Sequence, residues 1–91
     1  MRQCLRSFFS GWVQGVGFRY TVKTLARGFE VTGTVRNLPD GRVELVAEGE
    51  REELESFLHS IRDSEVGHFI KQTESHWGEA GQKFSGFEIT R

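Results

Sequence analysis

Residues 11–19 read Gly11-Trp12-Val13-Gln14-Gly15-Val16-Gly17-Phe18-Arg19 and lie between a strand-like segment and a helical one. The strand-like run covers residues 5–9, and from residue 18 the apolar spacing is that of a helix. The stretch therefore predicts a strand-to-helix loop with three glycines, which can take positive φ and lie close to a ligand. Unpaired N–H groups at the helix start, at the positive end of the helix dipole, favour a phosphate-sized anion there.

Arg19 supports the interpretation of this loop as an anion-binding site. It falls in the first turn of the predicted helix, where a cation opposes the dipole at a cost of roughly 0.3–1 kcal/mol. An anion between the loop amides and the guanidinium would remove this conflict, because the planar guanidinium can bind two phosphate oxygens at once. The residues alone leave open a second interpretation, a structural loop with a solvated arginine. The loop has neither the Lys-Ser/Thr ending of a P-loop nor the dinucleotide glycine spacing.

This stretch and a second one, Gly33-Thr-Val-Arg-Asn-Leu-Pro-Asp-Gly41, together resemble the two motifs of the acylphosphatase family, in order and at the expected separation. The resemblance covers nearly the whole chain, and its first half is the more specific. Residues 1–91 are expected to form one domain. The resemblance implies a small ferredoxin-like fold and metal-free hydrolysis of an acyl phosphate to a carboxylate and inorganic phosphate, with no cofactor. Trp12 stands where a small or basic residue is more frequent, and Thr34 where an aromatic is frequent.

The resemblance also implies roles for individual residues. Arg19 is expected to bind the substrate phosphate, and Asn37 to orient the attacking water. The other expected phosphate ligands are the backbone N–H groups of Gly15, Val16, Gly17 and Phe18. Without the resemblance, Asn37 would be interpreted as a cap for the turn at residues 39–41, a common use of Asn.

Hydrophobic periodicity predicts the order of the elements. The expected strands are residues 4–10, 31–38, 42–48, 66–77 and 84–90, and the expected helices are residues 18–28 and 50–62. The turn Leu38-Pro39-Asp40-Gly41 joins the second and third strands into a hairpin, and residues 79–82 are expected to form a loop. The order βαββαβ plus a C-terminal strand favours an α+β ferredoxin-like sandwich, with two helices on one face of an antiparallel sheet.

Composition narrows the functional classes. Hydrophobic residues at 36% and charged residues at 27% suit a soluble globular domain. The net charge of −1 lacks the basic excess of nucleic-acid-binding proteins, although a patch around Arg19 and Arg36 could attract a small anion. Cys4 is the only cysteine, and no apolar run approaches the ~20 residues of a membrane span. We therefore expect a cytoplasmic protein, a monomer, without nucleic-acid or membrane partners.

Other residues are weaker candidates. His59, His68 and His76 share no metal-ligand spacing, so no metal site is expected. Trp12 is expected either to pack or to contact an acyl group, and Tyr20 to face solvent. Two other functions remain open: a phosphate-binding or carbamoyl-phosphate-handling module that recruits a partner, and an RNA-binding ferredoxin-like domain. The latter would require exposed aromatics on two central strands, which Thr34 and residues 44–48 do not supply.

Overall fold

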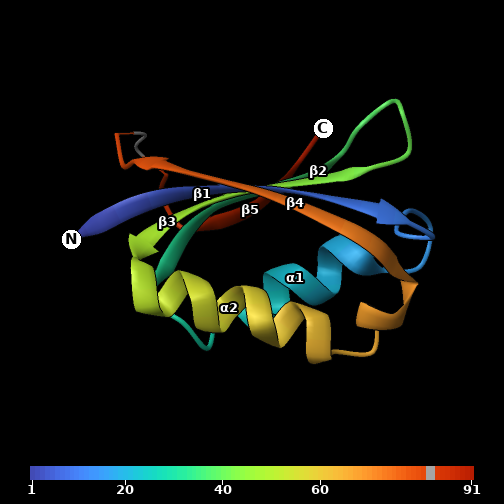
Figure 1. The fold of residues 1–91 in the computed structure, drawn as a ribbon, viewed down its shortest axis with the longest axis horizontal. Helices are drawn as coiled ribbons and strands as arrows, with labels where there is room; N and C mark the ends of the chain where they lie inside the picture. Colours follow the sequence, from blue (N-terminus) through green and yellow to red (C-terminus); the bar gives the residue numbers. More distant parts are fainter. Residues whose placement is uncertain (82–83) are drawn as a thin grey trace.

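The computed structural model describes residues 1–81 and 84–91 (Figure 1). Its elements, in chain order, are β1 (Arg2–Gly11), α1 (Phe18–Ala26), β2 (Val31–Asn37), β3 (Val43–Glu50), α2 (Arg51–Asp63), a 3-10 helix η1 (Gly67–Phe69), β4 (Ile70–Glu79) and β5 (Phe87–Thr90). The five strands form one sheet in the order β4-β1-β3-β2-β5. The predicted βαββαβ order with an added C-terminal strand is confirmed.

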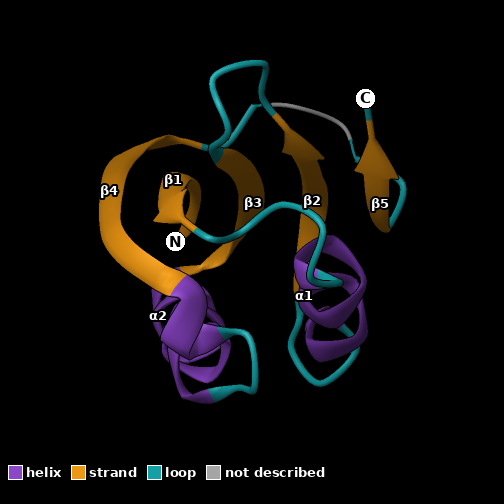
Figure 2. Cartoon of the chain, turned by 90° about the vertical axis from the view of Figure 1, so that its right-hand side faces the viewer, coloured by secondary structure: helices purple, strands orange, loops and turns teal. Residues whose placement is uncertain are grey.

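The sheet is mixed, not wholly antiparallel as expected. β1 pairs antiparallel with both β3 and β4, and β2 pairs antiparallel with β3. β5 instead runs parallel to β2 at the edge of the sheet, and the backbone N–H of Gly33 donates to the carbonyl of Gly86, 2.9 Å away, just before β5 begins. β4 and β5 therefore form the two opposite edges of the sheet (Figure 2).

Several predicted boundaries are wrong in the second half of the chain. Residues 66–69, expected in a strand, form a turn and η1, in which the N–H of Phe69 donates to the carbonyl of Val66 (3.1 Å). β4 extends to Glu79, into the predicted loop at 79–82; residue 82 of that loop lies outside the described residues. The last strand begins at Phe87, not at residue 84. These segments have weak alternation, so long-range pairing sets their ends rather than local sequence.

Both helices cover the same face of the sheet and enclose one core with it (Figure 2). The ring of Phe57 in α2 lies 5.6 Å from that of Phe29 and 5.7 Å from that of Phe87, so it joins α2, the turn after α1 and β5. Neither helix is long or apolar enough to cross a membrane, in the part of the chain that is described. The face without helices is also covered at its centre, since every residue of β3 from Val43 to Gly49 is buried.

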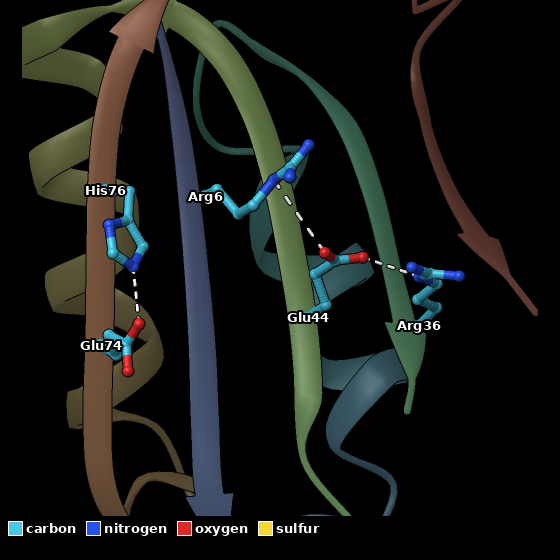
Figure 3. Close-up of polar contacts among 5 residues, drawn as sticks. All are labelled: Arg6, Arg36, Glu44, Glu74 and His76. Carbon is cyan, nitrogen blue, oxygen red and sulfur yellow. Dashed lines mark hydrogen bonds and ion pairs between the residues drawn. The ribbon is translucent and has the colours of Figure 1, made fainter. Parts of the chain in front are cut away.

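Two of these buried residues are acidic, which alternation alone would place on a solvated face. Glu44 is 9% exposed and accepts a hydrogen bond from Nε of Arg36 at 2.7 Å; Nε of Arg6 lies 3.9 Å from its other carboxylate oxygen (Figure 3). Glu48 is 2% exposed and accepts from the N–H of Gly81 at 3.0 Å. Arginines from the two neighbouring strands therefore compensate the buried charge of Glu44 on the open face.

Candidate functional site

The loop between β1 and α1, residues 12–17, is called the glycine loop below. Gly15 and Gly17 both have φ of 80°, a left-handed conformation that other residues rarely adopt. Gly17 is the N-cap of α1, and no side chain of the described residues caps the helix. The first helical hydrogen bond runs from the N–H of Thr21 to the carbonyl of Gly17 (3.0 Å), which leaves the N–H groups of the first turn outside the helical ladder.

The glycine loop is attached to the rest of the molecule on two sides. At its start, the N–H of Trp12 donates to the carbonyl of Phe69, 3.0 Å away. At its centre, Nε2 of Gln14 donates to two carbonyls of the β2–β3 hairpin, those of Leu38 (2.8 Å) and Arg42 (2.9 Å). Sequence reasoning gave Gln14 no role. Its sequence signals are a long amide side chain between an apolar residue and the glycines, and its place within the motif of residues 11–19.

Register places Asn37 in the same row of the sheet as Phe9, which packs against the start of α1. Val43 of β3 pairs with Phe9 of β1 on one side and with Asn37 of β2 on the other, so the three form one row across the sheet. Phe9 and Val43 lie in the core under the helices, and the ring of Phe9 is 5.2 Å from that of Phe18, the first residue of α1. The two predicted motifs therefore meet at one corner of the molecule.

The side chain of Asn37 has an unused acceptor at this corner. Within residues 1–81 and 84–91, its Oδ1 is buried and has no hydrogen-bond partner. Asn37 therefore does not cap the turn through Oδ1; instead, a carboxylate oxygen of Asp40 accepts from the N–H of Arg42 (3.1 Å). A buried polar atom without a partner costs free energy, so its retention points to a bound water or ligand.

Arg19 is half-buried in the first turn of α1, which contains no acidic residue. Among the described residues its guanidinium has no hydrogen bond or ion pair, whereas those of Arg36 and Arg42 are paired with carboxylates. Its positive charge is thus available to an anion at the helix start. The expected patch of Arg19 with Arg36 is not formed: Asn37 lies on the helix-covered face, so Arg36, its neighbour in β2, points to the open face (Figure 3).

The aromatic residues near the loop are exposed. Trp12 is 73% exposed, so the expectation that it packs is wrong, and contact with an acyl group remains the open alternative. Tyr20 is 71% exposed, as predicted. A hollow of about 670 Å³ lies elsewhere, between α1 and α2, and shares no lining residue with the glycine loop. The glycines of the candidate site, Gly15 and Gly17, are exposed at the surface.

His68 lies in η1, next to the residue that binds the start of the glycine loop, whereas the other titratable candidates lie in other elements. His59 pairs with Asp63 in α2 (3.0 Å), and His76 pairs with Glu74 in β4 (2.6 Å; Figure 3). No group of three or more His, Cys, Asp or Glu side chains suited to a metal ion occurs in the described part of the chain. Cys4 is half-buried in β1, and burial, followed by the nearby carboxylate of Glu48, raises the pKa of its thiol above 9.0.

Comparison with solved structures shows the class of protein to which this chain belongs. The crystal structure of acylphosphatase from Bacillus subtilis superimposes on this chain with a TM-score of 0.89 and 34% identity, covering 100% of both chains. The class is therefore that of small ferredoxin-like domains with a glycine loop before the first helix.

Sequence relatives identify the family. The profile described as Acylphosphatase matches residues 5–89. The acylphosphatase of Acaryochloris marina is 39% identical over 97% of this chain and 94% of its own, and that of Thermus thermophilus is 43% identical over 93% and 96%. The chain belongs to the acylphosphatase family. The prediction made from the two motifs is confirmed, and the family and the fold support an acylphosphatase function.

Proposed function

We propose that this protein hydrolyses acyl phosphates without a metal ion, with the phosphate held by residues 15–19 and the attacking water held by Asn37. The observation that carries the proposal is the buried Oδ1 of Asn37, which has no hydrogen-bond partner among the described residues. It lies at the end of β2, next to the residue that the glycine loop contacts through Gln14. Arg19, whose charge has no acidic partner among the described residues, supplies the second element. Family membership supplies the substrate class.

The phosphate would be bound by backbone donors and one cation. The N–H groups of Gly15, Val16, Gly17 and Phe18 would donate to its oxygens, and the guanidinium of Arg19 would bind two of them. These donors are fixed before substrate arrives, so they stabilise charge on the phosphoryl oxygens without reorganisation as the bond to the acyl oxygen breaks.

Asn37 would position the water without removing its proton. A carboxamide does not exchange protons near neutral pH, but its oxygen can accept a hydrogen bond from water. The water oxygen attacks phosphorus, the bond from phosphorus to the acyl oxygen breaks, and the carboxylate leaves. A phosphate oxygen of the substrate takes the proton of the water. Asp40 is unsuited as the base, because hydrogen bonds from the backbone and side chain of Arg42 lower the pKa of its carboxyl.

The test measures hydrolysis of a simple acyl phosphate in the presence of a chelator by the wild type, Arg19→Ala and Asn37→Ala. Loss of one preorganised donor typically costs roughly 10²–10³ in rate, so Arg19→Ala should be nearly inactive. Asn37→Ala should also be nearly inactive, because the attacking water loses the group that orients it. Asn37→Ala should retain affinity for inorganic phosphate, whereas Arg19→Ala should lose it. Arg27→Ala, an exposed arginine just beyond the same helix, is the matched control and should resemble the wild type.

Two outcomes would contradict the proposal. Equal loss of phosphate affinity in Arg19→Ala and Asn37→Ala would refute the division of roles. A folded wild type that binds phosphate without turnover would instead indicate a phosphate-binding module that recruits a partner.

We further propose that residues 1–91 form one domain that acts as a monomer in the cytoplasm. The described residues share one core, and their radius of gyration of 11.8 Å agrees with the value of about 12 Å expected for one domain of this length. A lone thiol suits a reducing compartment. Light scattering would test the monomer, and a dimer at micromolar concentration would contradict it.

A further inference from the structure

The side chain of Gln14 links two segments that are far apart in sequence. Its Nε2 donates to the carbonyl of Leu38 at 2.8 Å and to that of Arg42 at 2.9 Å, across 24 and 28 residues. Both N–H groups of the amide are therefore used, and both acceptors belong to the base of one hairpin. The backbone on either side of Gln14 is also fixed, since the side chain of Val13 is 1% exposed and Gly15 follows with φ of 80°.

These hydrogen bonds are not needed to close the hairpin. The N–H of Leu38 donates to the carbonyl of Arg42 at 2.8 Å, and the N–H of Gly41 donates to the carbonyl of Leu38 at 3.1 Å. Each carbonyl that Gln14 contacts therefore has a backbone donor of its own. What the amide of Gln14 adds is a connection from the glycine loop to the residue that directly follows Asn37.

We infer that Gln14 is a positioning residue, which sets the distance and orientation between the loop that holds the phosphate and the side chain of Asn37. The inference rests on the proposed function. In-line attack requires the water on Asn37 to lie opposite the bond that breaks, and a misplacement of about 1 Å can cost on the order of 100-fold in rate. Gln14 contacts neither the phosphate nor the water in this arrangement; it acts through the backbone of Leu38.

The first test is Gln14→Met, which keeps the length of the side chain and removes both donors. We expect kcat for an acyl phosphate to fall by roughly 10- to 100-fold. The inhibition constant for inorganic phosphate should change less than about threefold, because the loop amides and Arg19 remain. Gln72→Met is the matched control, since Gln72 is exposed in β4 and should tolerate the change without effect.

A second variant, Gln14→Glu, gives a readout that a purely structural role would not produce. The ionised carboxylate cannot donate to the two carbonyls, whereas the protonated acid has one O–H donor. The kcat of the folded variant, relative to wild type at the same pH, should therefore rise as the pH falls through the pKa of the new carboxyl. A ratio that does not change with pH would count against positioning.

Three further results would overturn the inference. Wild-type kcat in Gln14→Met would do so, even if the variant melts at a lower temperature, because Gln14 would then be structural only. Parallel loss of kcat and phosphate affinity would place Gln14 in phosphate binding. A wild type without turnover would overturn both the proposed function and this role, whereas an active wild type with an unaffected Gln14→Met would overturn the role alone.

Discussion

Some residues of the candidate site could be predicted from the sequence alone, and others could not. The loop glycines and Arg19 could be predicted because positive φ and a cation in a first helical turn are local properties. The role of Asn37 could not be predicted in this way. An Asn shortly before Pro39-Asp40-Gly41 indicates a turn cap, and only the family resemblance implied a catalytic role. In the structure it is Asp40 that accepts the N–H of Arg42, while Oδ1 of Asn37 is left without a partner in the described chain. An unpartnered atom depends on the whole environment and leaves no sequence signal.

Gly17→Ala tests the loop conformation at this scale. A Cβ at Gly17 meets no atom within 4 Å, so the substitution acts through φ of 80° alone. A left-handed non-glycine residue costs roughly 1–2 kcal/mol, which should appear as a lower free energy of unfolding in chemical denaturation. If the loop relaxes instead, its N–H groups turn and phosphate affinity falls.

Gly78→Ala is the control for this variant, because Gly78 lies in β4, has an ordinary φ and also has open space around it. A Gly17→Ala variant with the stability and the phosphate affinity of Gly78→Ala would show that the left-handed conformation is dispensable.

At the scale of elements, those defined by a local sequence pattern could be predicted, whereas those defined by long-range strand pairing could not. Both helices and the β2–β3 hairpin could be predicted, because amphipathic spacing and the Pro-Asp-Gly turn lie within one segment. The C-terminal strand begins three residues later than predicted, and it runs parallel to β2, whereas an antiparallel sheet was expected. Its pairing with β2 joins residues more than 50 positions apart, and no local periodicity encodes such a partner. The same applies to Gln14, whose acceptors lie in another element.

Asp40 should make the hairpin turn sensitive to acid. Hydrogen bonds from the backbone N–H and then the side chain of Arg42 lower the pKa of its carboxyl below 3.8. A group whose pKa is lowered by folding adds stability above its unfolded pKa, and this stability is lost as the pH falls through the folded pKa. The wild type should therefore be slightly more stable than Asp40→Asn at pH 7. The difference should shrink as the pH falls below the unfolded pKa and vanish once the pH is below the folded pKa of Asp40.

Thermal unfolding of both proteins from pH 7 to pH 2 measures this difference. Glu65→Gln, an exposed carboxylate outside the hairpin, serves as the control. A stability difference between wild type and Asp40→Asn that persists unchanged at pH 2 would contradict the assignment.

On the scale of the whole molecule, one core under two helices carries the stability, and arginine–carboxylate pairs cover the opposite face. The layer arrangement followed from the order of elements. The burial of Glu44 and Glu48 could not be predicted, because alternation assigns acidic residues to a solvated face. Their burial depends on Arg6 and Arg36 from the neighbouring strands and on the chain near Gly81.

Phe57→Ala tests whether this core unfolds as one unit. The ring is fully buried and contacts Phe29 and Phe87, so its removal should lower the free energy of unfolding by about 3–5 kcal/mol. Far-ultraviolet circular dichroism and tryptophan fluorescence should shift together in denaturant. Phe8→Ala, a half-buried residue on the other face, should cost less. Separate transitions for the two signals would contradict a single cooperative domain.

The order of the strands has a consequence for self-association. Edge strands of a sheet expose unpaired N–H and carbonyl groups. Another chain can add a strand to these groups, which can start aggregation. The two edge strands differ in this protein. β5 has only four residues, which is too short to pair with a long added strand. β4 has ten residues and carries charges at Lys71, Glu74 and Glu79. Short length on one side and charge on the other both disfavour such growth, which lets the open sheet persist at high protein concentration.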